Sequence, residues 1–117
     1  MRLNYDLIRD ILLKIEEITD GNVNIFTDSF AESTFPNENP DIVNFHLRYL
    51  RQRGFIYPTE YDSFFIGLTP TGYDYLNSVR DYSVWNSVKQ ILTKCVSPTL
   101  DVVKAIAISI IKENAHL

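Results

Sequence analysis

The chain has 117 residues, 45% of them hydrophobic, and a formal net charge of −4. This length suits one compact domain, and this apolar content excludes a disordered chain. The acidic balance excludes a strongly basic nucleic-acid coat or a basic membrane-surface peptide, although it does not tell where the charges lie. Cys95 is the only cysteine, and the chain has only two histidines. No apolar run reaches the length of a membrane span. We therefore expect a cytoplasmic protein without disulfide, metal, cofactor or membrane segment.

The first segment predicts an amphipathic helix over residues 4–19, with Asn4 as its N-cap. A short strand is expected over residues 23–27, and a loop with room for one helical turn over residues 28–39. The apolar residues of the helix recur at steps of three and four, which places them on one buried stripe: Leu7, Ile8, Ile11, Leu12, Ile15 and Ile18.

A second helix is predicted over residues 40–53, because Asn39 is a good N-cap, Pro40 suits the first turn and Gly54 can end the helix. Its buried stripe is Val43, Leu47 and Leu50, and we expect His46 to be a partly buried helix residue.

A β-hairpin is predicted next. Residues 55–57 and 64–66 are short apolar runs, and a polar connection with a proline joins them. Three further helices are expected over residues 70–81, 83–94 and 97–114. The apolar residues of the last helix cover more than one face, so it is either sandwiched within the domain or paired with another chain.

Two stretches carry a resemblance to known proteins. HLRYLRQRGFI from His46 and LTPTGYDYL from Leu68 are similar to the winged-helix regulators of the arsenic-repressor and multiple-antibiotic-resistance type. Nearly the whole chain resembles a family of small uncharacterised bacterial and prophage proteins, described as a domain of unknown function. The resemblance implies a winged helix-turn-helix, mainly α with a small β-hairpin wing, and a mobile-element context. It supplies no activity to transfer.

On this basis we expect a winged-helix domain over residues 1–81. A C-terminal helical extension over residues 82–117 would pack on it in a single compact unit. The chain departs from the pattern of these regulators in one place. Residues 28–39 are expected to form a loop, whereas a regulator has the first helix of its helix-turn-helix there.

The charges are unevenly distributed along the chain. Residues 41–58 carry a net charge of +2, whereas residues 1–40 carry −5. Asn44 can read adenine and Arg48 guanine through paired hydrogen bonds, and Arg51 and Arg53 suit phosphate contacts. The same arginines also fit a merely solvated helix face. The DNA-binding candidates are Asn44, Arg48, Arg51, Gln52 and Arg53.

The tip of the expected wing has the opposite charge. Glu60 and Asp62 flank Tyr61 there, and phosphate would repel both carboxylates. This tip is therefore a candidate surface for a protein partner, and an acidic surface can also mimic DNA toward a basic host protein.

Catalysis finds no support in the sequence. There is no nucleophile motif around His46, and the four glycines are expected at turns rather than in a phosphate-binding loop. We predict a small winged-helix transcriptional regulator of a bacterial or prophage genome that binds double-stranded DNA as a homodimer, and not an enzyme. The alternative is a winged-helix protein-interaction module that binds a host protein. The candidate dimer residues are Val103, Ile106, Ile110 and Ile111.

Overall fold

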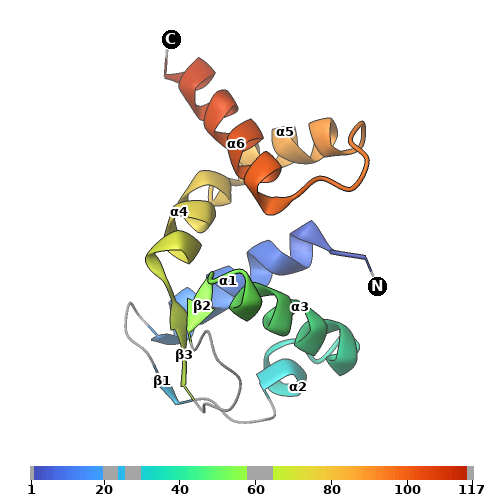
Figure 1. Cartoon of the computed structure of the whole chain (residues 1–117), viewed down its shortest axis with the longest axis vertical. Coiled ribbons are helices and arrows are strands. Elements are labelled where there is room, and N and C mark those ends of the chain that lie inside the picture. Colours follow the sequence, from blue (N-terminus) through green and yellow to red (C-terminus); the bar gives the residue numbers. More distant parts are fainter. Residues whose placement is uncertain (1, 20–23, 26–29, 58–64, 116–117) are drawn as a thin grey trace. The chain divides into compact units, whose positions relative to one another are not determined.

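The computed structural model describes residues 2–19, 24–25, 30–57 and 65–115 (Figure 1). The fold is mainly α-helical with a small antiparallel sheet, as predicted. In chain order the elements are α1 (Tyr5–Thr19), β1 (Asn24–Ile25), α2 (Phe30–Thr34), α3 (Pro40–Gln52), β2 (Ile56–Tyr57), β3 (Phe65–Leu68), α4 (Pro70–Val79), α5 (Tyr82–Leu92) and α6 (Leu100–Asn114).

The chain divides into two compact units, Met1–Tyr73 and Asp74–Leu117. The boundary falls inside α4, so this helix begins in the first unit and continues in the second. The expected division lay later, after Asp81.

The first unit combines a three-stranded sheet with α1, α2 and α3 (Figure 1). The strand order is β1-β3-β2, so the strand latest in the chain lies in the middle, and both pairings are antiparallel. β3 packs against α1, and α3 packs against α1, α2 and β2. The hairpin prediction is confirmed for β2 and β3, and the polar connection between them lies outside the described residues.

The core of this unit includes the apolar stripe of α1, which is buried as predicted except at its end. Ile18 is 42% exposed, whereas Thr19 is 2% exposed. Both positions lie at a similar angle from the centre of the stripe, so periodicity does not choose between them. Thr19 tolerates burial because its hydroxyl donates a hydrogen bond to the Ile15 carbonyl at 2.7 Å. The expectation that Ile18 ends the buried stripe is therefore wrong.

The second unit is built around the packing of α5 against α6. Asp81 caps α5 by accepting from the Val84 N–H, and Thr99 caps α6 by accepting from the Val102 N–H. These caps fix where the two helices begin. The buried side chains of the pair are Val84, Trp85, Val88, Leu100, Val103 and Ala107.

Candidate nucleic-acid interface

Helix α3 begins and ends at residues whose chemistry favours helix boundaries. The Asn39 side chain accepts from the Asp41 N–H at 2.9 Å, and Pro40 takes the first helical position. At the other end, Arg53 is the C-cap and Gly54 follows with a φ of +74°. A left-handed residue of this kind commonly ends a helix, and glycine adopts it without strain. The boundaries predicted from the sequence are thus confirmed to within one residue.

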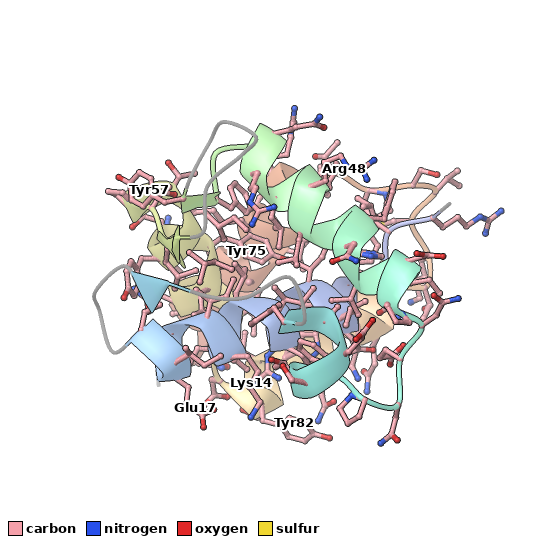
Figure 2. The ribbon with its side chains drawn as sticks, turned by 90° about the horizontal axis from the view of Figure 1, so that it is seen from below. Lys14, Glu17, Arg48, Tyr57, Tyr75 and Tyr82 are labelled. Carbon is pink, nitrogen blue, oxygen red and sulfur yellow. The ribbon has the colours of Figure 1, made fainter. Side chains whose placement is uncertain are left out.

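Helix α3 has one buried face and one exposed face. The buried face consists of Val43, His46, Leu47 and Leu50. On the other side, Asp41, Asn44, Arg48 and Gln52 are exposed and recur at steps of three and four residues. Figure 2 shows Arg48 on the side of α3 that faces away from α1. We call the four exposed residues the outer stripe of α3.

Three of the five predicted DNA-binding residues belong to the outer stripe: Asn44, Arg48 and Gln52. Within the described part of the chain, none of these three side chains has a hydrogen-bond or ion-pair partner. Arg53 is also exposed, just after the helix. Arg51 differs, because it is half-buried and its Nε atom is buried. The structure therefore brings amide and guanidinium donors together on one open helix face, with Arg51 set to its side.

Asp41 adds a negative charge at the start of the outer stripe. It lies in the first turn of α3, where the partial positive charge of the helix N-terminus favours a carboxylate. The stripe is therefore acidic at its first residue and basic from Arg48 onward.

The exit of α3 is tied to the start of α4 by hydrogen bonds. The Thr69 hydroxyl donates to the Gly54 carbonyl at 2.5 Å, and the Thr69 N–H donates to the Phe55 carbonyl at 3.2 Å. The Gly72 N–H in turn donates to the Thr69 hydroxyl at 3.0 Å, which caps α4. We call this arrangement of Gly54, Phe55, Thr69 and Gly72 the exit clamp. It fixes the direction in which the chain leaves α3.

Gly72 allows the two segments of the exit clamp to approach closely. A Cβ atom at this position would overlap the Phe55 carbonyl oxygen. The sequence led us to expect this glycine at a turn, but it lies inside α4, and Gly67 lies inside β3. The sequence did contain a signal for this close approach, namely a glycine just after the Thr-Pro start of a helix. Glycine is unfavourable inside a helix, so its presence there often indicates that another segment packs closely against it.

His46 is fully buried rather than partly buried, with 0% exposure. Its Nε2 atom accepts a hydrogen bond from the backbone N–H of Asn4 at 2.9 Å. The Nδ1 atom must therefore carry the proton, which it donates to the Ile42 carbonyl at 2.7 Å. The Nδ1 bond fixes the ring on α3, and the Nε2 bond holds the start of α1 against α3. The sequence pattern gave no indication of this partner, which lies 42 residues away.

The other two groups of predicted site residues have different outcomes. Glu60, Tyr61 and Asp62 lie outside the described residues. In α6, Ile106 and Ile110 are half-buried and Ile111 is 39% exposed. Val103 is 0% exposed within the chain itself. Val103 therefore offers no exposed surface to a second copy, unlike the three isoleucines.

No three His, Cys, Asp or Glu side chains among the described residues lie close enough together to hold a metal ion. No described helix combines the length and apolar character needed to cross a membrane.

Comparison with known proteins places the chain in a family. Residues 2–97 match the family described as "Hypothetical protein (DUF2513)". The chain belongs to this family. A relative from Haemophilus influenzae, described as "Uncharacterized protein", is 34% identical over 120 residues, which cover 97% of this chain and 98% of the relative. No solved structure matches the chain. The resemblance to a domain of unknown function is confirmed, and the residues matched by the family include α1 to α5 but not α6.

Proposed function

We propose that the first unit is a winged-helix domain that binds double-stranded DNA through α3, and that the protein is a small transcriptional regulator. The order α1-β1-α2-α3-β2-β3, with β3 between the other two strands, supports the winged-helix assignment. The five-residue helix α2 occupies part of the stretch expected to be a loop and packs against α3. A helix-turn-helix needs a helix before its recognition helix, and in this proposal α2 is that helix.

The observation that carries the proposal is the outer stripe of α3. In a helix-turn-helix the recognition helix enters the major groove, and residues on its exposed face reach base edges and phosphates. Asn44 can pair with adenine and Arg48 with guanine, since each presents two hydrogen-bonding groups in one plane. Gln52 and Arg53 would follow along the groove toward the phosphates.

A DNA titration tests the proposal. A fluorescently labelled duplex of mixed sequence is titrated with the full chain at several salt concentrations, and anisotropy reports binding. We expect measurable affinity at low salt and a linear fall of log affinity with log salt, because phosphate contacts release counterions. A duplex that shows no anisotropy change at low salt would contradict DNA binding.

Charge reversal at Glu60 and Asp62 separates this function from a protein-interaction module. The variant with Glu60→Lys and Asp62→Lys is expected to bind the duplex at least as tightly as the wild type, because two phosphate-repelling groups become attractive. If the reversal instead abolishes duplex binding, these carboxylates contribute to the binding surface and the expected repulsion between the wing tip and phosphate is wrong.

We also propose that two copies associate through α6, so that a dimer offers two α3 helices to the DNA. Ile106, Ile110 and Ile111 remain partly exposed there. Asp101 and Lys112 lie three turns apart on similar sides of α6, both exposed. In an antiparallel pair each could face the opposite charge of the second copy.

Sedimentation equilibrium tests the association. We expect a dimer at tens of micromolar that dissociates when Ile110 and Ile111 are both replaced by aspartate, because burying those carboxylates is costly. A wild-type chain that sediments as a monomer at that concentration would remove the dimer.

A further inference from the structure

The part-buried hydrogen bond between His46 and Asn4 connects the N-terminal segment to the proposed recognition helix. His46 lies on α3, and Asn4 lies immediately before α1. The first N–H groups of a helix have no partner within it, so an acceptor from another element can take one of them. Here His46 Nε2 takes the Asn4 N–H, while the Asn4 side chain accepts from the Leu7 N–H at 3.0 Å. Asn4 is thus held from two sides.

Holding Asn4 also limits where Arg2 can go. Two residues of extended chain span at most about 7 Å, so the Arg2 backbone stays close to the side of α3. Arg2 is exposed, and its side chain has no hydrogen-bond or ion-pair partner within the described part of the chain. A long cationic side chain without a partner is thereby attached to the flank of the helix that carries Arg48.

The acidic groups of the two elements at this point are Asp6 in the first turn of α1 and Asp41 in the first turn of α3. Both lie where a helix N-terminus offsets part of a negative charge. The Arg2 guanidinium can extend away from these two carboxylates. It is then better suited to bind a polyanion than a protein surface of mixed charge, because it can form two parallel hydrogen bonds with a phosphate group.

We propose that Arg2 makes a phosphate contact of the DNA interface, and that His46 is the positioning residue that holds Arg2 beside α3. This inference rests on the proposed function. DNA-binding domains can extend the reach of a recognition helix with an N-terminal arm. An arm that is tied down before binding loses less conformational freedom on the DNA than a free one, so the tie adds to affinity.

The test compares variants of the full chain on the same duplex over a range of salt concentrations. Arg2→Ala is expected to weaken binding about 3- to 10-fold and to lower the slope of log affinity against log salt by about one, as the loss of one phosphate contact requires. Lys14→Ala is the matched control, because Lys14 pairs with Glu17 at 3.3 Å on a side of α1 away from Arg48 (Figure 2). It should leave affinity and slope unchanged.

Two comparisons test the role of His46: whether the effects of His46→Leu and Arg2→Ala on DNA binding add up, and whether His46→Gln restores binding. His46→Leu is expected to reproduce the loss of slope, and adding Arg2→Ala to it should weaken binding little further, since the arm is already released. His46→Gln should restore part of the binding, because its amide oxygen can again accept from Asn4. A purely structural role would change the free energy of unfolding without changing the slope. If His46→Leu does not fold, the Arg2→Ala and His46→Gln variants still decide the question.

The outcomes separate this inference from the proposed function. If Arg48→Ala lowers the slope while Arg2→Ala does not, the arm makes no contact but α3 still binds DNA. If neither variant changes the slope, both proposals fail. If the double variant of His46 and Arg2 is additive, Arg2 acts without the help of His46 and the positioning role is overturned.

Discussion

Replacing Gly72 by alanine is expected to lower the free energy of unfolding by about 2–4 kcal/mol, the range of a severe steric substitution. The new Cβ would overlap the Phe55 carbonyl oxygen. That oxygen has little freedom to move, because it accepts from the Thr69 N–H at 3.2 Å while the Phe55 N–H donates to Leu50 at 2.9 Å. This expected loss of stability is opposite to the effect of helix propensity, which favours alanine over glycine by about 1 kcal/mol inside a helix. Urea denaturation followed by circular dichroism measures the effect.

Gly54 provides the matched control for this substitution. Its φ is +74°, and a Cβ there would meet no atom within 4 Å. Gly54→Ala should therefore cost about 1–2 kcal/mol, the backbone strain of a left-handed residue without a steric clash. Gly54→Asn should cost less than Gly54→Ala, because asparagine tolerates that conformation. If Gly72→Ala is no more destabilising than Gly54→Ala, the close approach within the exit clamp is wrong.

Replacing Arg48 by alanine is expected to weaken duplex binding about 10- to 100-fold, the usual cost of losing a paired arginine contact to guanine. Arg48 is exposed and has no hydrogen-bond or ion-pair partner in the described part of the chain, so the fold does not depend on it. The free energy of unfolding should therefore change by less than about 0.5 kcal/mol. Anisotropy titration and urea denaturation of the same sample measure both quantities.

Arg48→Lys separates the charge of this residue from its geometry. Lysine keeps the positive charge but lacks the planar pair of donors. We expect this variant to keep the salt slope of the wild type while discriminating less between duplex sequences. Equal affinity of wild type and Arg48→Ala on every duplex tested would exclude the outer stripe of α3 as the contact surface.

Most of the helices could be predicted from local chemistry alone, whereas the five-residue helix α2 lies in a stretch expected to be a loop. Asn4 and Asn39 cap the helices that the sequence assigned to them, because a short polar side chain before an apolar repeat favours a helix start. Thr69 and Thr99 cap α4 and α6 in the same way. The end of α3 followed from Gly54 in the same way. The order of the strands could not be predicted, because pairing β1 with β3 joins segments some forty residues apart that share no local signal.

The candidate site was predicted in part. The spacing of Asn44, Arg48 and Gln52 places them on one helix face, and the structure confirms that all three are exposed. Spacing does not show what lies beside a helix, and for that reason it missed the partial burial of Arg51 and the full burial of His46. The closure of the exit clamp on Gly72 and the pairing of His46 with Asn4 depend on contacts between distant segments, which one sequence does not specify.

The central claim is that the exposed face of α3 is the surface that touches DNA. Nuclear magnetic resonance spectra of the 15N-labelled chain, recorded while an unlabelled duplex is added, test it most directly because they report each residue separately. We predict that the largest shift changes fall at Asn44, Arg48, Gln52 and Arg53, including the side-chain amides of Asn44 and Gln52. Shift changes confined to α6, or an unchanged spectrum at low salt with excess duplex, would contradict the claim.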